Sequence, residues 1–360
     1  MLGCLLVLTG CSERQSALFL WSDYAYRMGN SLQLDIPVDV DRGGRPADWQ
    51  SLRYPSRRQL LYAVPTSSIN LLEFLRLSRC ELQRLIGQRN TSLGQLAPGS
   101  QRFLYEWRFL QLARECVRQL QAAPGGDADI ALAEELQRVV AEKSNSLPLV
   151  YWNAVAASEE FQTLFSLAAQ PLGPVQAQVM PTALIDSLQG LLQIQRALIE
   201  HPGGELSSLQ HLESHFQVLA ASHHFGQLTL AMATAVPPLQ AITAALQRRL
   251  QDPPLCYQQR PTPQARILES VFHKVYIGRV QPYLSALHRQ SIALQPLLQQ
   301  FYTRAQGATV SLPPIHSEWW QATWAPAPAN SAWQHFDAAL SDHTRAWQQL
   351  LSSCGLMPRP

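Results

Sequence analysis

Apolar residues recur every three or four positions along most of the chain, which is the period of amphipathic helices. Two such stripes cover residues 71–86 and 103–120, and Pro98-Gly99 separates them, so the pattern predicts a helical hairpin over 68–122. Further helices are predicted at Ser16–Met28, Ile130–Lys143, Ser158–Ala168, Pro181–Ile199, Ser207–Ala221, Leu228–Arg249, Pro263–Arg304 and Ser331–Ser353. Strand-like runs are few, so we predict an all-α fold, a multi-helix bundle that forms either one body or two packed helical halves.

Prolines and glycines mark where these helices bend or end. Pro237-Pro238 should kink or split the helix that contains it, and Pro282 and Pro296 should bend a later one. The alternating stretch Leu34–Val40 contains Pro37 and predicts a short extended segment. The resulting segments are a signal peptide at 1–10, an N-terminal helix and tether at 11–66, a helical bundle with the hairpin at 67–252, a C-terminal helical part at 253–354 and a tail at 355–360.

The first residues indicate export. Leu2–Leu8 is an apolar run too short to span a bilayer, and Leu8-Thr9-Gly10-Cys11 follows it. That order resembles a bacterial lipobox, which implies a lipid on Cys11, and Ser12 after the cysteine implies sorting to the outer membrane, facing the periplasm. No Lys or Arg precedes the run, which suggests a start upstream of Met1. The alternative is a soluble protein with a chance cysteine near its start.

Four further cysteines suit an oxidising compartment: Cys80, Cys116, Cys256 and Cys354. An even number predicts two disulfides with three possible pairings. The midpoint of Cys80 and Cys116 is residue 98, so both lie at similar heights on the predicted hairpin and should pair. By elimination Cys256 pairs with Cys354. Each bond should contribute on the order of 3 to 5 kcal/mol.

Charge argues against nucleic acid as a partner. Charged residues make up 15% of the chain and the net charge is +2, without a basic run. Lysine occurs only at Lys143 and Lys274. Gly-x-Ser-x-Gly, P-loop, Gly-x-Gly-x-x-Gly and Ser-x-x-Lys motifs are missing, so no catalytic residue and no cofactor is predicted.

The tip of the hairpin is the strongest candidate for binding, because guanidinium, amide, hydroxyl and carboxylate groups should converge there and could hold an anion. The residues are Arg89, Asn90, Ser92, Arg102, Tyr105 and Glu106. The alternative is a loop of capping residues, with Ser100 as an N-cap and Arg102 and Glu106 as an i,i+4 pair.

Two other clusters are weaker candidates. Trp319, Trp320 and Trp324 lie among prolines and could stack on sugars or lipid, or could fill the end of the bundle. His211 and His215 have the i,i+4 spacing of metal ligands, but their His-Leu-Glu-Ser-His context is not that of a zinc hydrolase. We therefore predict no metal site and keep a periplasmic metal binder as an alternative.

Several short motifs carry a resemblance to a known family. They are Tyr54-Pro55-Ser56-Arg57-Arg58, Cys80-Glu81-Leu82-Gln83, Arg89-Asn90-Thr91-Ser92-Leu93-Gly94, Ser100-Gln101-Arg102, Tyr105-Glu106 and Trp152-Asn153. Together they resemble an uncharacterised gammaproteobacterial lipoprotein family, classed as a domain of unknown function, family number 3080. The resemblance covers most of the chain and implies a lipoprotein, without an activity, substrate or cofactor.

The leading hypothesis is a membrane-anchored periplasmic lipoprotein that binds a partner protein or an envelope component such as cell wall or lipid. The alternative is an envelope hydrolase that uses the Arg89 to Glu106 cluster. A deep pocket at that cluster would favour the enzyme, and a broad apolar patch without a pocket would favour the partner binder.

Overall fold

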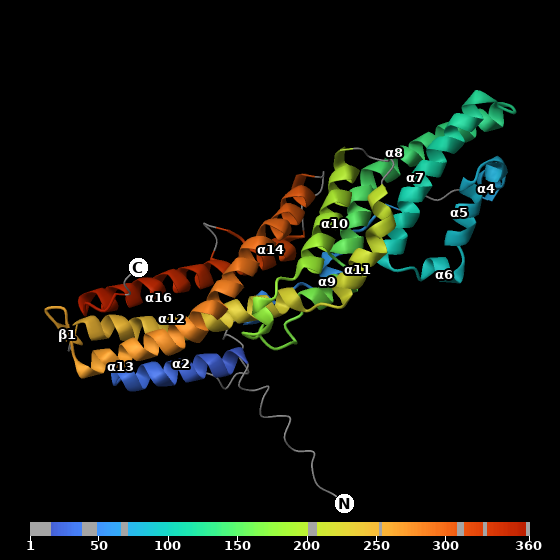
Figure 1. Ribbon diagram of the computed structural model, residues 1–360. Helices are drawn as coiled ribbons and strands as arrows, with labels where there is room; N and C mark the ends of the chain where they lie inside the picture. Colours follow the sequence, from blue (N-terminus) through green and yellow to red (C-terminus); the bar gives the residue numbers. More distant parts are fainter. Residues whose placement is uncertain are drawn as a thin grey trace, which may run out of the picture.

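The computed structural model describes residues 16–37, 49–65, 71–200, 207–251, 254–307, 313–326 and 330–357, and it confirms the all-α fold (Figure 1). The predicted signal peptide, Cys11 and the extended segment beyond Pro37 lie outside these residues.

In chain order the elements form three consecutive stretches. The first runs α2 (Ala17–Leu32), η1 (Trp49–Leu52), α3 (Arg57–Leu60), α4 (Leu71–Arg76), η2 (Leu77–Arg79), α5 (Leu82–Arg89) and α6 (Ser92–Gln95). The second runs α7 (Gly99–Ala122), α8 (Asp127–Val155), α9 (Glu159–Leu164), η3 (Gln176–Gln178), α10 (Thr182–Glu200), η4 (Ser207–His211), α11 (Leu212–Ala220) and α12 (His224–Gln251). The third runs β1 (Cys256–Tyr257), β2 (Arg260–Pro261), α13 (Pro263–Val271), the π-helical η5 (Phe272–Val280), α14 (Gln281–Gly307), α15 (Pro314–Thr323) and α16 (Ala332–Ser353).

The molecule is elongated (Figure 1). At one end α2 lies beside α12 and α13, with α16 on α12, and at the other end α7 and α8 form a long antiparallel pair flanked by α4–α6. One main core runs through most of this length, from Trp21 and Trp347 to Phe103 and Leu110, and a smaller core lies under α5, α7 and α8. Across the boundary predicted at 252, α12 before it packs against α16 after it.

The predicted hairpin over 68–122 is wrong in one respect. The stripe at 71–86 is not one helix, because it is interrupted at Cys80, where the backbone is extended (φ −119°, ψ 142°). The long antiparallel partner of α7 is α8. Between them Gly126 adopts φ 146°, a conformation that favours glycine and allows the reversal.

Both predicted disulfides are confirmed. Cys80 and Cys116 are bonded with a Cα–Cα distance of 5.5 Å, which holds the start of α5 against α7. Cys256 and Cys354 are bonded with a Cα–Cα distance of 5.1 Å, which ties the β1–β2 hairpin to the end of α16.

Of the two outcomes predicted at Pro237-Pro238, a kink or a split, the split is wrong, since α12 continues from His224 to Gln251. Leu239, Ile242 and Leu246, which follow the prolines, are fully buried, and this packing holds the helix together across two missing N–H donors. Within the described part of the chain, α12 is also the single helix long and apolar enough to cross a membrane, and 61% of its most apolar window is buried in the fold. Its place between α2, α14 and α16 is that of a core helix.

Proline also marks an irregularity later in the chain. The π-helical η5 ends two residues before Pro282, which lacks the N–H that would continue an α-helical ladder. Pro296 lies inside α14 without ending it. The helical region predicted at Pro263–Arg304 thus runs without a gap through α13, η5 and α14.

Candidate functional site

The chain turns sharply at α6, between α5 and α7. Thr91 is the N-cap of α6 and its hydroxyl accepts a hydrogen bond from the Gly94 N–H at 3.2 Å. A Cβ on Gly94 would lie 2.5 Å from the Arg89 carbonyl oxygen, so only glycine lets α6 approach the end of α5 this closely. The predicted hairpin tip is therefore a folded corner.

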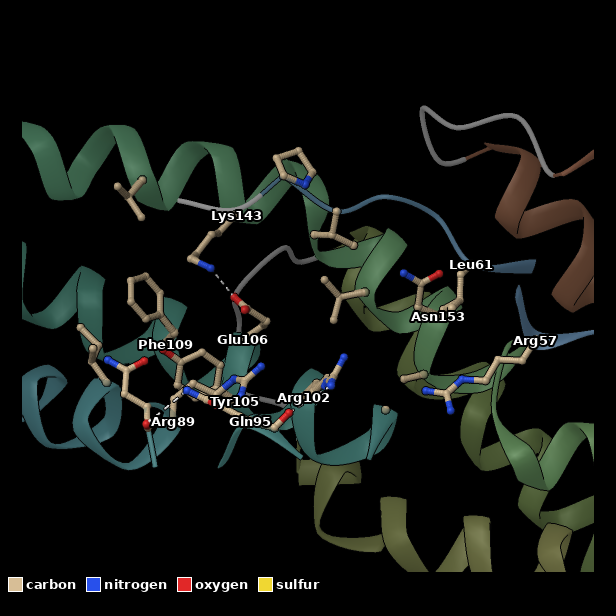
Figure 2. A pocket seen from close by; sticks show the side chains of 18 of the residues that line it. Arg57, Leu61, Arg89, Gln95, Arg102, Tyr105, Glu106, Phe109, Lys143 and Asn153 are labelled. Atoms are coloured by element: carbon tan, nitrogen blue, oxygen red, sulfur yellow. Dashed lines mark hydrogen bonds and ion pairs between the residues drawn. The ribbon is translucent and has the colours of Figure 1, made fainter. Parts of the chain in front are cut away.

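A groove of about 890 Å³ lies beside this corner, and Figure 2 shows it from close by. Its walls come from the 57–65 segment, α4, α5, α7 and α8. Apolar side chains form much of the lining: Leu61, Val64, Pro65, Phe74, Ile86, Phe109, Val139, Val150 and Ala154. Polar and charged side chains contribute the rest: Arg57, Arg89, Asn90, Gln95, Arg102, Tyr105, Glu106, Lys143 and Asn153.

The groove carries more positive than negative charge. Lys143 Nζ lies 2.6 Å from Glu106 Oε2, with the two side chains 14% and 23% exposed, and Lys143 also lies over the Phe109 ring at 4.9 Å. Glu106 is the one carboxylate among the described lining residues, so three guanidinium groups remain without a carboxylate inside the groove. Arg57 has a partner outside it, the exposed Glu159, at 3.8 Å.

The other two arginines are held by backbone carbonyls. Arg89 donates to the Gly94 carbonyl, and Arg102 donates from Nε to Ala97 O at 3.0 Å and from Nη2 to Gln95 O at 3.2 Å. These bonds fix the guanidinium groups without neutralising them, since a carbonyl carries no net charge. The predicted alternative, an Arg102–Glu106 pair with Ser100 as N-cap, is wrong, because Glu106 turns to Lys143 and Pro98 is the N-cap of α7.

Tyr105 sits between these charges. The Arg89 guanidinium lies 5.7 Å from the centre of the Tyr105 ring. Burial, with a smaller contribution from the neighbouring Glu106, raises the pKa of Tyr105 to about 12, and Arg89 opposes the rise. The phenol is therefore neutral near pH 7 and can donate a hydrogen bond to a ligand.

Five of the six predicted corner residues line the groove, and Ser92 does not. Lys143 was missed as a site residue, since it lies 37 positions from Glu106 and on a different helix. Arg57 and Asn153 were missed too, although both belong to the motifs that carry the family resemblance. That shared origin is the signal that could have found them.

Asn153 fixes one wall of the groove. Its Oδ1 accepts from the Tyr62 N–H at 2.9 Å and its Nδ2 donates to the Tyr62 carbonyl at 2.9 Å. The neighbouring Trp152 donates from Nε1 to the Leu60 carbonyl at 3.0 Å. The end of α8 thereby holds the 57–65 segment in place over the groove.

A second hollow of about 590 Å³ lies on the other side of the corner. Arg89, Arg102 and Tyr105 line both hollows, so they form the wall between them. The second hollow adds Arg108 and the apolar Leu85, Leu104 and Trp107, and no carboxylate appears among its described lining residues. The excess of positive charge thus extends across the corner.

The predicted tryptophan cluster is buried. Trp319, Trp320 and Trp324 are 6%, 3% and 0% exposed, so their rings cannot stack on a ligand at the surface. They fill the core, which was the alternative considered. Trp319 and Trp320 also line a small internal cavity of about 30 Å³, together with His316 and Gln195.

Of the predicted histidine pair, His215 contributes to packing and His211 is exposed. A Cβ on Gly190 would lie 2.3 Å from His215 Nε2, so the His215 ring packs against the backbone of α10. Burial, and to a lesser extent His211, lowers the pKa of His215. Among the described residues no group of three or more His, Cys, Asp or Glu is placed to hold a metal ion.

These observations define an all-α protein with a cationic, partly apolar groove. The groove lies beside the α6 corner, and a disulfide holds the start of the preceding helix α5. The chain belongs to the family described as "Protein of unknown function (DUF3080)", which matches residues 21–358. No match was found among curated proteins or among solved structures.

Proposed function

We propose that this protein binds an amphipathic anion in the groove between α5, α7, α8 and the 57–65 segment. The observation that carries the proposal is the combination of four cationic side chains, one carboxylate and a largely apolar lining in a single groove. A ligand with a phosphate or carboxylate head and an apolar tail complements both parts of it.

The head group has defined partners. Arg89 and Arg102 are held by backbone carbonyls, so they lose little side-chain freedom when an anion binds. The neutral Tyr105 phenol adds a donor beside them. Phe74, Ile86, Phe109 and Val139 offer the tail an apolar wall next to these donors.

The same geometry supports binding better than hydrolysis. Glu106 is the carboxylate available to act as a base, and it is held by Lys143 at 2.6 Å. The described lining of the groove contains no Ser, Thr, Cys or His to act as a nucleophile. An envelope hydrolase at this corner is therefore the second candidate, favoured by the size of the groove, about 890 Å³.

A full-length protein titrated with dodecyl phosphate below its micelle concentration tests the proposal by calorimetry, with dodecyl maltoside as a neutral comparison. Lys143→Met should weaken dodecyl phosphate binding by about tenfold or more, because it removes a cation of the groove and leaves the Glu106 carboxylate unpaired there to repel the anion. A charge-assisted contact is worth roughly 1.5–3 kcal/mol. Lys274→Met removes the other lysine of the chain, an exposed one, and should change nothing.

Glu106→Gln should have the opposite effect on dodecyl phosphate binding. It removes the negative charge and frees Lys143, so dodecyl phosphate should bind more tightly than to the wild type. Equal binding of both detergents, or weaker anion binding by Glu106→Gln, would overturn the proposal.

We further propose that the protein is anchored in the outer membrane through a lipid on Cys11 and faces the periplasm. The Leu8-Thr9-Gly10-Cys11 sequence and two disulfides, which persist in oxidising compartments, support this address. Labelled palmitate should be incorporated by the wild type and not by Cys11→Ser. Retention of the label by the variant would exclude Cys11 as the anchor.

A further inference from the structure

Two leucines at the α6 corner stand fully outside the fold. Leu93 and Leu96 are 85% and 82% exposed, the highest values among the large apolar side chains that the structure describes. Leu93 lies in α6 and Leu96 is its C-cap, three positions on, so both lie on the same side of this short turn. Neither belongs to a core cluster.

The corner that carries them is held in place. Arg102 binds the carbonyls of Gln95 and Ala97, Arg89 binds that of Gly94, and Thr91 caps α6. The leucines therefore project from a defined turn and not from a loose loop.

The surroundings of the leucines are cationic. From residue 82 to 105 the sequence contains Arg84, Arg89 and Arg102 and neither Asp nor Glu. Two carboxylates near this stretch are engaged: Glu213 accepts from Gln101 at 2.6 Å, and Glu106 pairs with Lys143. Leucines bordered by arginines and amides complement a surface that is anionic outside and apolar beneath.

We propose that the α6 corner docks on an anionic lipid surface, with Leu93 and Leu96 inserted between the head groups and the arginines close to the phosphates. Interfacial segments combine apolar insertion with basic residues in this way. The apolar area is small for a protein–protein interface, which buries about 800 Å² on each partner. This inference goes beyond the groove and does not depend on it, but it would place the groove entrance next to a source of amphipathic anions.

Co-sedimentation with vesicles tests the docking, using the full chain with Cys11→Ser so that no acyl chain contributes. Binding to phosphatidylglycerol vesicles should exceed binding to phosphatidylcholine vesicles and should weaken as salt is raised. Leu93→Asp with Leu96→Asp should lower binding to phosphatidylglycerol by at least about tenfold, since burial of two leucines is lost.

The matched control is Val175→Asp with Val179→Asp, a pair of residues 59% and 69% exposed at η3, which should bind like the wild type. Equal loss in both double variants, or no preference for phosphatidylglycerol, would overturn the proposal. So would a chain that ignores vesicles but forms a dimer that the Leu93 and Leu96 changes dissociate, because the patch would then belong to a second copy.

The proposals for the groove and for the α6 corner can be tested independently. Lys143→Met should lose dodecyl phosphate and keep vesicle binding, whereas the Leu93 and Leu96 double variant should do the reverse. Loss of both properties in both variants would indicate one shared surface and contradict the assignment of two.

Discussion

The Tyr24 hydroxyl lies 2.9 Å from Nε2 of His343 and links α2 to α16, 319 residues apart, inside the core. Trp347 Nε1, which can only donate, lies 2.9 Å from the same hydroxyl. Trp347 Nε1 also lies 3.2 Å from His343 Nε2, so Nε2 is an acceptor and Tyr24 donates to it. The proton of the neutral ring is then on Nδ1, which faces Thr243 Oγ1 at 3.0 Å. This buried network joins the first described helix to the last.

Tyr24→Phe should destabilise the protein by about 1–3 kcal/mol, because it removes one hydrogen bond from each of two buried groups, His343 Nε2 and Trp347 Nε1, and leaves them only their mutual contact at 3.2 Å. Chemical denaturation monitored by circular dichroism measures the change. Tyr26→Phe is the control on the same helix, since Tyr26 is 69% exposed, and it should leave the midpoint unchanged. Equal midpoints for the two variants would argue against the network.

Stability should fall as the pH is lowered from about 6.5 toward 3. Burial lowers the pKa of His343 to about 3, against an opposing backbone hydrogen bond at Leu239, and burial lowers that of His316 to about 4, both from an ordinary value of 6.5. Above pH 6.5 both rings are neutral in the folded and unfolded chain, so their contribution is complete. Below it only the unfolded chain takes up protons, which costs up to about 1.4 kcal/mol per pH unit for each ring until the folded pKa is reached.

His316→Phe should remove one of these two contributions and flatten the pH dependence of unfolding between pH 6 and 4. His316 Nδ1 is buried without a hydrogen-bond partner, so the substitution leaves no neighbour unpaired through that atom. His335→Gln, at an exposed position, should keep the wild-type slope. A wild-type slope in His316→Phe would show that the ring does not titrate on unfolding.

The Cys80–Cys116 bond should matter for the groove as well as for stability, because α5 carries Ile86 and Arg89 into the lining. Replacing both cysteines by Ala should cost about 2–4 kcal/mol and weaken dodecyl phosphate binding. Removing the Cys256–Cys354 bond in the same way should lower stability and leave binding intact, because that bond is at the other end of the molecule. Undiminished binding after loss of Cys80–Cys116 would contradict this role.

Gly94→Ala should disturb the corner, since the added methyl would meet the Arg89 carbonyl at 2.5 Å. Binding of dodecyl phosphate should weaken, as Arg89 and the Gly94 carbonyl move. Gly87→Ala meets nothing within 4 Å and lies inside α5, so it should stabilise the helix by about 0.5–1 kcal/mol with binding unchanged. If the two alanine variants bind alike, the corner geometry is not what positions Arg89.

The two lysines allow a direct readout of the site. Lys274 is exposed, whereas Lys143 is 14% exposed and paired with Glu106, so an amine-reactive reagent should modify Lys274 faster. Dodecyl phosphate should protect Lys143 further without affecting Lys274, as measured by peptide mass spectrometry. Protection of both or neither would place the ligand elsewhere.

The sequence was most informative where the physics is local. A helical period survives in any packing, so the all-α class and the helices at Ala17–Leu32, Gly99–Ala122 and Ala332–Ser353 could be predicted. The Cys80–Cys116 pairing was predictable for a related reason, because the two cysteines are equally far along the sequence from Pro98, where the chain was expected to turn. The break at Cys80 and the continuity of α12 through its prolines were not, because tertiary packing overrode local preference there.

By itself, then, the sequence determined the helical class, both disulfides and most of the polar residues of the corner, because these follow from periodicity, spacing and composition along the chain. Only the tertiary structure decided that Glu106 meets Lys143, that Asn153 holds the 57–65 segment through the Tyr62 backbone, and that the tryptophans of 319–324 are core. Those outcomes depend on which helix faces lie together, and such contacts between distant segments are fixed by the packing of the whole core rather than by any local pattern.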